Sequence, residues 1–264
     1  MKYYLIENDI DKIKHFDQIG IDRIFIDLEK LGKDDRQKNL DTVKSNHTIQ
    51  DIYNVKPILK RAELLVRVDP INSNSKNQIN DVIDAGADVV MLPFFKTAEE
   101  VQKFIDFVNG RAKTNILIET AAAFVRFKDI LAIDGIDEVH VGLNDLSIDL
   151  DLKFMFEIIA HRFLVPLTQY LKEKGIFFGI GGVAALDDGK LRGRSILAEY
   201  YNLGASATIL SRTFTKIYNK DADRFEEEYA KLAIEWSGLV NREESFFEDN
   251  IKEINKIVNS IIKS

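Results

Sequence analysis

The chain alternates short apolar runs with segments of helical periodicity, and this alternation is the feature that most limits its possible folds. Several runs are continuous stretches of β-branched and apolar residues, as expected for strands that are buried on both faces. The predicted strands cover residues 3–7, 23–28, 63–68, 88–92, 115–119, 138–142, 176–180 and 205–210.

The segments between these runs are predicted to be helices. Residues 77–85 have apolar residues at helical spacing and end at Gly86, and residues 97–108 open with a threonine cap and end near Gly110. Further helices are predicted over 187–201 and 213–233. A repeated strand–helix pattern in 264 residues predicts an α/β fold, a (β/α)₈ TIM barrel, with a doubly wound sheet as the alternative.

Two segments depart from the pattern. Residues 29–46 form a long, charged connection, which in a compact domain is typical of a functional loop. Residues 236–264 are predicted to be a C-terminal helical extension beyond a catalytic barrel domain of residues 1–235. The extension carries a narrow apolar stripe, which is expected to pack on the barrel base or on a neighbouring subunit of a homo-oligomer.

Composition limits the partners. The formal net charge is −7, and the chain contains no run rich in lysine or arginine, which argues against nucleic-acid binding. The absence of cysteine excludes thiolate metal sites and cysteine nucleophiles. No apolar run is long enough to span a membrane, and acidic residues near the N-terminus do not suit a secretory signal. A cytoplasmic protein is expected.

Acidic side chains follow two consecutive predicted strands. Glu119 ends the fifth strand and Asp145, beside Asn144, follows the sixth, so the two carboxylates are expected to meet at the carboxyl end of a barrel. Such carboxylates both ionise when a cation lies between them, and Mg²⁺ (or Mn²⁺) suits one or two carboxylates plus substrate oxygens. The alternative is that Asp145 caps a turn and that Glu119 is a solvated rim residue.

Arg67 lies near the end of the apolar run of the third strand, where a guanidinium needs an anionic partner. The partner is either a substrate carboxylate or, in the alternative interpretation, Glu29 or Asp69. A metal facing this arginine would suit a small anionic keto acid and the formation of a metal-stabilised enolate. The competing route is a Schiff-base lysine, but the predicted fifth to eighth strands contain none.

These residues lie in sequence blocks that resemble a known family. FIDLEK, LLVRVDP, GADVVMLPFFKTAEEV, ILIETAAAF and GIDEVHVGLNDLS occur in the order found in the HpcH/HpaI aldolase and citrate lyase β-subunit family. The resemblance implies a barrel that binds Mg²⁺ or Mn²⁺ through Glu119 and Asp145, with Arg67 as the carboxylate binder. It also implies carbon–carbon lyase chemistry on keto acids or their CoA thioesters, in an oligomer that exchanges C-terminal helices.

The chain departs from this family at two positions. The aldolase branch has a histidine after its Asp-x-Glu pattern, and Lys30 occupies that position here, whereas Phe94 follows Pro93 where the citrate-lyase branch has a lysine. Lys30 is a candidate for proton transfer or else a rim charge, and Glu29 and Asn144 are candidates for substrate binding. We therefore expect a metal-dependent aldolase or lyase. The alternatives are a citrate-lyase-like thioester lyase and a barrel that binds a ligand without turnover.

Three further features are weaker candidates. His140 lies within the sixth strand and is expected to be a core residue, and His47 is expected at a helix start. Gly181 and Gly182 follow the seventh strand, where backbone N–H groups of such barrels often bind phosphate, although a tight turn explains a glycine pair equally well.

Overall fold

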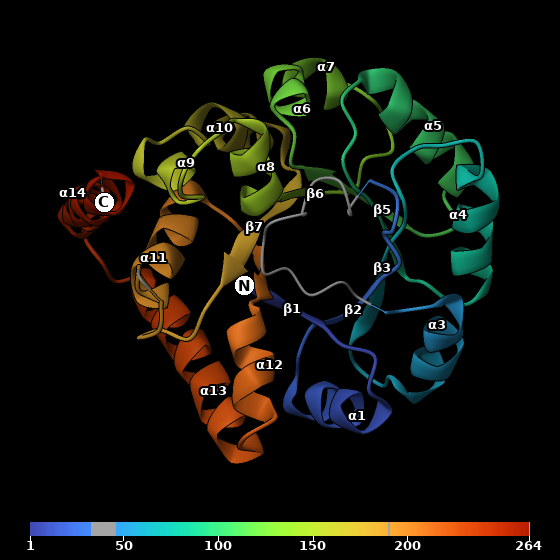
Figure 1. Ribbon diagram of the computed structural model, residues 1–264, viewed down its shortest axis with the longest axis horizontal. Coiled ribbons are helices and arrows are strands. Elements are labelled where there is room, and N and C mark those ends of the chain that lie inside the picture. Colours follow the sequence, from blue (N-terminus) through green and yellow to red (C-terminus); the bar gives the residue numbers. More distant parts are fainter. Residues whose placement is uncertain (33–45, 190, 264) are drawn as a thin grey trace. The chain divides into compact units, whose positions relative to one another are not determined.

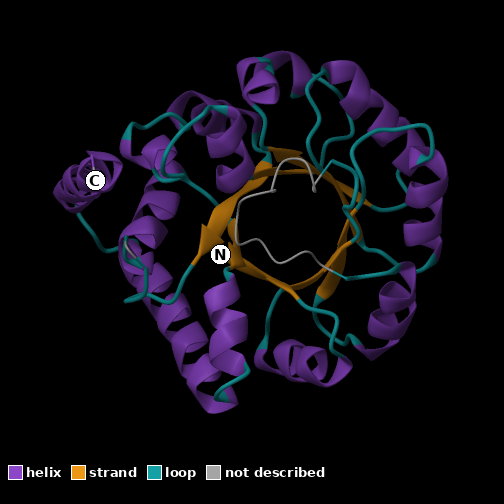
Figure 2. Ribbon diagram, viewed as in Figure 1, coloured by secondary structure: helices purple, strands orange, loops and turns teal. Residues whose placement is uncertain are grey.

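The computed structural model describes residues 1–32, 46–189 and 191–263 and contains all eight predicted strands, with small shifts at their ends. The strands are β1 (Lys2–Ile6), β2 (Arg23–Asp27), β3 (Glu63–Arg67), β4 (Val89–Leu92), β5 (Lys113–Ile118), β6 (Glu138–Val141), β7 (Phe177–Val183) and β8 (Ala207–Leu210). They close into a barrel in sequence order, so the predicted TIM-barrel class is confirmed (Figure 2).

The helices follow the strands along the chain. They are α1 (Ile10–Ile19), α3 (Ile49–Val55), α4 (Ser75–Asp84), α5 (Ala98–Val108), α6 (Ala121–Val125), α7 (Phe127–Ile130), α8 (Leu143–Asp149), α9 (Glu157–Ala160), α10 (Val165–Lys174), α11 (Gly193–Leu203), α12 (Arg212–Tyr218), α13 (Ala222–Leu239) and α14 (Glu244–Lys263), with a 3₁₀ turn at Lys56–Ile58. None of these described helices combines the length and apolarity that a membrane span requires.

The chain divides into two compact units, one of residues 4–140 and the other of residues 1–3 with 141–264. In the first unit, β1 to β5 pair in parallel, and α1, α3, α4 and α5 lie on the outer side of these strands (Figure 1). The inward and outward faces of the strands are both covered, which explains why their sequences are continuous apolar runs.

Helix α5 begins where the sequence predicts. The Thr97 side chain accepts the Glu100 N–H at 3.3 Å, and the Glu100 carboxylate accepts the Thr97 N–H at 2.9 Å, which completes a capping box. The helix ends at Asn109 in the left-handed conformation, one residue before Gly110. Two otherwise unpaired N–H groups at the start of α5 are thus satisfied by local sequence alone.

The predicted helix over 187–201 begins later than expected, at Gly193. A Cβ atom at this position would lie 2.5 Å from the carbonyl oxygens of Ala184 and Ala185, so α11 can begin against the preceding loop only with a glycine there. The predicted helix over 213–233 is divided into α12 and α13, because Asp221 accepts the Arg224 N–H at 3.1 Å and starts a new helix.

The C-terminal residues are helical, as predicted: α13 runs through residue 236 to Leu239, and α14 follows it. The division into a barrel domain of residues 1–235 and an extension of residues 236–264 stays a prediction. The apolar stripe of α14 includes Ile251, Ile254 and Val258, and these residues are buried where α14 packs on α9 and α11 of its own chain. Asn255 donates to the carbonyl oxygen of Ala160 at 2.7 Å in the same contact. Exchange of this helix between subunits stays a prediction.

Arg23 is fully buried at the amino end of the barrel strands and is the centre of a charged network. Its guanidinium pairs with both carboxylate oxygens of Glu138, donates to Glu63 at 2.8 Å and donates to the Tyr4 hydroxyl at 2.8 Å. Burial acts to lower the pKa of Arg23, but the hydrogen bond and charge of Glu138 outweigh it and raise the pKa. Ion pairs of Arg23 with Glu138 and Glu63, in addition to apolar packing, therefore stabilise the amino end of the barrel, which we call the barrel floor.

The observed β5 begins two residues before the predicted strand of residues 115–119 and therefore includes one lysine at its start. Lys113 is the first residue of β5, and its ammonium lies 2.5 Å from Glu63 at the amino end of the strands. Because chemistry in barrels takes place at the carboxyl ends, Lys113 is not placed for a Schiff base there.

Asp17, in α1, is hydrogen-bonded to the segment that precedes β3. Its buried carboxylate accepts the backbone N–H groups of Lys60, Arg61 and Ala62 at 3.0, 2.9 and 2.7 Å. Burial acts to raise the pKa of Asp17, but these three donors and the nearby Arg61 charge outweigh it and lower the pKa. The ionised form is therefore the one that the fold stabilises.

Asp17→Asn is expected to lower the free energy of unfolding by about 1–3 kcal/mol at pH 7, since an amide cannot accept from all three donors as a carboxylate does. The pKa is lowered on folding, so this stabilisation is complete above the ordinary value of 3.8 and is lost as the pH falls through the lower folded value. Urea unfolding of both proteins at neutral and acidic pH measures it. Asp11→Asn, an exposed position in the same helix, is the control and should change little.

Candidate active site

The parallel pairing of β2 with β3 brings a carboxylate and a guanidinium together at the strand ends. The register continues to the pair Asp27↔Arg67, so both side chains extend from the same face of the sheet. Arg67 donates from Nε to Asp27 Oδ1 and from Nη2 to Asp27 Oδ2, both at 2.9 Å. This bidentate geometry fixes the plane of the guanidinium.

Arg67 has a second carboxylate partner in Glu29, whose Oε2 lies 3.4 Å from Nε. One of the two partners named for the internal interpretation, Glu29, is thus in contact, whereas Asp69 is not. The Asp69 carboxylate instead accepts the backbone N–H groups of Lys30 and Leu31 at 2.7 and 2.9 Å. Glu29 therefore contacts the arginine that was predicted to bind substrate, and its own role in substrate binding stays a prediction.

The Arg67 side chain is fixed by its carboxylate partners but keeps some exposed surface. Its side chain is 13% exposed, compared with 5% for Asp27 and 2% for Glu29. Within the described part of the chain, its Nη1 group donates no hydrogen bond. Burial acts to lower the pKa of Arg67, but the charges of Asp27, Glu29 and Glu119 outweigh it and raise the pKa. Arg67 thus remains a cation with hydrogen-bonding capacity beyond its two carboxylate partners.

Glu119 follows β5 in the same unit as Arg67 and is 2% exposed. Its Oε1 atom accepts the backbone N–H of Phe94 at 3.0 Å. Phe94 has a φ of 50°, a left-handed conformation that is uncommon for a residue other than glycine. The strained turn after β4 therefore directs a main-chain donor at this carboxylate and orients it. Glu119 is a buried acid rather than a solvated rim residue.

The donor chemistry of Glu119 fits a hard divalent cation. No group of three or more acidic or histidine side chains with metal-ligand geometry occurs among residues 1–32, 46–189 and 191–263. Mg²⁺ commonly takes only one or two protein carboxylates and completes its octahedron with water and substrate oxygens, so a buried, oriented glutamate is compatible with it.

The other predicted metal ligand lies in the second unit. Asp145 is half-buried in the first turn of α8, where a negative charge is favourable near the helix N-terminus. Asn144 is exposed, and its backbone carbonyl oxygen accepts a hydrogen bond from the Ser147 hydroxyl at 2.7 Å. The predicted roles of Asp145 in metal binding and of Asn144 in substrate binding stay predictions.

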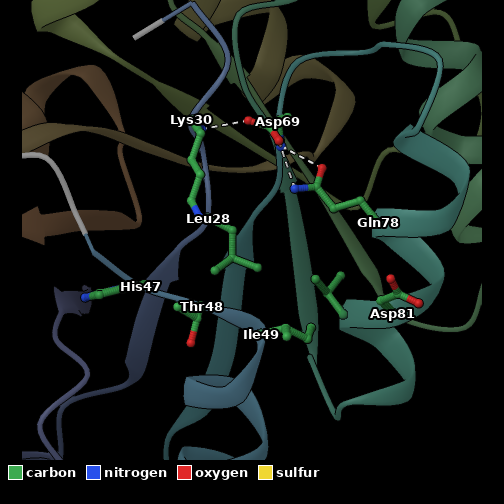
Figure 3. Close-up of a pocket in the computed structure, with 9 residues that line it drawn as sticks. Leu28, Lys30, His47, Thr48, Ile49, Asp69, Gln78 and Asp81 are labelled. Carbon is green, nitrogen blue, oxygen red and sulfur yellow. Dashed lines mark hydrogen bonds between the residues drawn. The ribbon is translucent and has the colours of Figure 1, made fainter. Parts of the chain in front are cut away.

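Lys30 lies beside a cavity of about 400 Å³ in the first unit (Figure 3). Its side chain is exposed and shares the cavity with residues of α3 and α4, among them Ile49 and Asp81. The described residues that line the cavity do not include Arg67 or Glu119. The proton-transfer role of Lys30 stays a prediction, and Lys33 and Arg36 of the same connection lie outside the described residues.

His47 also lines this cavity, and the sequence did not indicate its contact with β2. It precedes Thr48, the cap residue of α3, so the prediction of a helix start is confirmed. Its ring is buried, and Nδ1 accepts the backbone N–H of Asp27 at 3.0 Å. The capping-box residues Thr48 and Asp51 mark the helix, but no local pattern indicates that the preceding histidine reaches β2.

The remaining candidates have structural roles. His140 is a core residue as predicted, 1% exposed, with its ring centroid 5.9 Å from that of Tyr4. Gly181 has a φ of 41°, and a Cβ atom there would lie 2.7 Å from the Tyr200 hydroxyl oxygen. Close packing thus requires this glycine, and phosphate binding by Gly181 and Gly182 stays a prediction.

A closed parallel barrel with a carboxylate-anchored arginine and a buried glutamate at the strand ends is characteristic of enzymes rather than of structural barrels. The family model described as HpcH/HpaI aldolase/citrate lyase matches residues 2–155. The chain therefore belongs to the HpcH/HpaI aldolase/citrate lyase family, whose members are aldolase- and lyase-type enzymes.

Individual relatives agree with this family at low identity. A hydroxypyruvate/pyruvate aldolase of Roseovarius nubinhibens is 25% identical over 166 residues, which is 51% of this chain and 64% of that protein. This chain thus spans less than two thirds of that relative.

Solved structures show the same fold. An HpcH/HpaI aldolase from Desulfitobacterium hafniense DCB-2 matches with a TM-score of 0.65, 17% identity, and coverage of 86% of this chain and 93% of that chain. The citrate synthase SbnG matches with a TM-score of 0.63, 17% identity, and coverage of 87% and 94%.

Asp27→Asn is expected to destabilise the fold by about 1–3 kcal/mol, because it leaves the buried Arg67 with one charged partner instead of two. Glu29→Gln, which alters the longer contact, should cost less. Urea unfolding of the two variants and the wild type compares them. Equal losses in both variants would contradict the primary role given to the bidentate pair.

Proposed function

We propose that the protein is a divalent-metal-dependent carbon–carbon lyase of the aldolase type that acts on a small keto acid. The observation that carries this proposal is Arg67, a guanidinium fixed by Asp27 and Glu29 whose Nη1 group has no acceptor among the described residues and can donate to a further anion. A buried cation with donors beyond its internal partners suits a carboxylate ligand, which accepts from a planar fork.

Substrate selection by this site depends on charge balance. Arg67 is one cation among Asp27, Glu29 and Glu119, which are all nearly buried. A substrate carboxylate alone would add a further negative charge to this group, which costs free energy unless a second cation is present. This excess of acidic groups supports the proposal of a divalent ion as part of the functional protein.

The ion is proposed to be Mg²⁺ or Mn²⁺, with Glu119 and Asp145 as its protein ligands. The buried, oriented carboxylate of Glu119 supports the first assignment. The second rests on the position of Asp145 in the sequence block that resembles the family. When bound, such an ion acts as a Lewis acid and stabilises negative charge on the oxygen of a carbonyl group.

The proposed reaction is cleavage of a 4-hydroxy-2-keto acid. The 4-hydroxyl loses its proton to a base, for which Lys30 in its neutral form is the candidate in this chain, the C3–C4 bond breaks, and C4 leaves as an aldehyde carbonyl. The bonding electrons remain on C3 as the enolate of pyruvate, which then takes up a proton at C3. In this scheme Arg67 binds and orients the carboxylate, and the buried acids and β-strand ends hold that guanidinium still.

Lys30 in place of the family histidine supports a second candidate, a barrel that binds a keto acid without turnover. Its ammonium is exposed beside a cavity that the described residues Arg67 and Glu119 do not line. The two candidates share the binding step and differ in whether products form.

The metal assignment predicts that Mn²⁺ binds the wild-type protein and that Asp145→Ala and Glu119→Gln each weaken binding at least about tenfold, because each removes one charged ligand. Electron paramagnetic resonance of free Mn²⁺ during a titration measures this. Asp149→Ala, a later position of α8, serves as the matched control. Wild-type affinity in both ligand variants would refute the assignment.

The lyase assignment predicts release of pyruvate from a panel of 4-hydroxy-2-keto acids in the presence of Mg²⁺. Arg67→Lys should retain the charge but lose the fork, so kcat/KM should fall about 10²-fold or more. A coupled assay for pyruvate measures the rate. Ligand binding without product formation by the wild type would favour the binding-only candidate, whereas a fully active Arg67→Lys would contradict the role of the guanidinium.

A further inference from the structure

Among the described residues, the end of β2 has backbone partners in β3 on one side and no strand partner on the other. Its register with β3 continues to Asp27↔Arg67, and the Leu28 N–H donates to the Arg67 carbonyl oxygen at 2.9 Å. Its register with β1 stops two residues earlier, at Ile6↔Phe25. The Asp27 N–H therefore lies beyond the end of the β1 ladder and, being buried, needs another acceptor.

His47 supplies that acceptor. Its Nδ1 atom lies 3.0 Å from the Asp27 nitrogen, and the imidazole is buried at 7% exposure immediately before α3. The histidine is held there by its neighbours, since Thr48 and Asp51 close a capping box at the start of α3. A side chain from one connection thus continues the hydrogen-bond ladder of a strand.

The geometry determines the chemical form of the ring. Because Nδ1 accepts an N–H, the proton of the neutral imidazole resides on Nε2. The ring in this form offers no lone pair to abstract a proton from a substrate. His47 therefore does not replace the family histidine as a base, even though its ring contacts the end of the strand that the family histidine follows.

We propose that His47 is a positioning residue for carboxylate binding. Its Nδ1 acceptor fixes the main chain at Asp27. The Asp27 carboxylate then fixes Nε and Nη2 of Arg67. The remaining edge of the Arg67 guanidinium is thereby directed at the substrate carboxylate. This inference rests on the proposed function, since it names the support of the same arginine.

The test compares variants that differ in where an acceptor lies. His47→Asn places its carbonyl oxygen near the position of Nδ1, His47→Leu has a similar size but no acceptor, and His47→Gln carries its acceptor one bond further out. Binding of pyruvate to each protein in saturating Mg²⁺ is measured by calorimetry. We expect affinity within about threefold of wild type for Asn and about tenfold weaker binding for Leu and Gln, the equivalent of one buried hydrogen bond.

A second measurement reports on the arginine without any ligand. The ¹H–¹⁵N resonance of the Arg67 side-chain Nε group, assigned by its loss in Arg67→Lys, should persist in the wild type and His47→Asn. It should shift or broaden in His47→Gln and His47→Leu. If His47→Leu fails to fold, His47→Gln gives the comparison, and thermal unfolding monitors this.

The outcomes separate the two proposals. Wild-type affinity and an unchanged Arg67 resonance in His47→Gln or His47→Leu would overturn the positioning role, and so would a His47→Asn protein as impaired as His47→Gln. A wild type that binds no pyruvate would refute the proposed function alone, because the resonance of Arg67 would still show whether His47 positions it.

Discussion

The pairing of β2 with β3 is the constraint on which the candidate site depends. Parallel register places Asp27 opposite Arg67 on the last rung of the ladder, so a bidentate charged pair forms without any movement of the main chain. A shift of one residue in β2 relative to β3 would turn Asp27 to the face of the sheet opposite to Arg67. The site is therefore specified by backbone hydrogen bonds along five residues before its own charges contribute.

Much of the fold was predictable because burial leaves a periodic trace in the sequence. The continuous apolar runs gave all eight strands, and the capping box at Thr97 and Glu100 gave the start of α5. The start of α11 was not predictable, since it depends on the approach of two carbonyl groups to Gly193. Strand-end position indicated Arg67 and Glu119. The internal partners predicted for Arg67 were Glu29 or Asp69, and its bidentate partner Asp27 was missed, because register between neighbouring strands is not visible in local sequence. Likewise, the contact between His47 and Asp27 joins residues 20 apart in sequence, and no periodicity records it.

Family membership and the local differences describe the protein together. The chain belongs to the HpcH/HpaI aldolase/citrate lyase family, yet it has Lys30 where the aldolase branch has histidine and Phe94 where the citrate-lyase branch has lysine. The structure shows the surroundings of both residues. Lys30 borders a cavity whose described lining lacks Arg67 and Glu119, and the left-handed Phe94 orients Glu119 through its main-chain N–H. Phe94, where the resemblance implies a lysine in one branch, thus contacts Glu119 through its main chain.

The charged floor of the barrel has a consequence for how sequences of this kind can diverge. Arg23 has no exposed surface, and its guanidinium is shared among Glu138, Glu63 and Tyr4. Replacement of Arg23 or Glu138 alone leaves the other charge inside the barrel without its main counter-ion, whereas simultaneous replacement of the whole set by apolar residues of equal volume need not leave any buried charge. Evolution at these positions should therefore be epistatic, with lineages that either keep the arginine and its acids together or exchange them as a block.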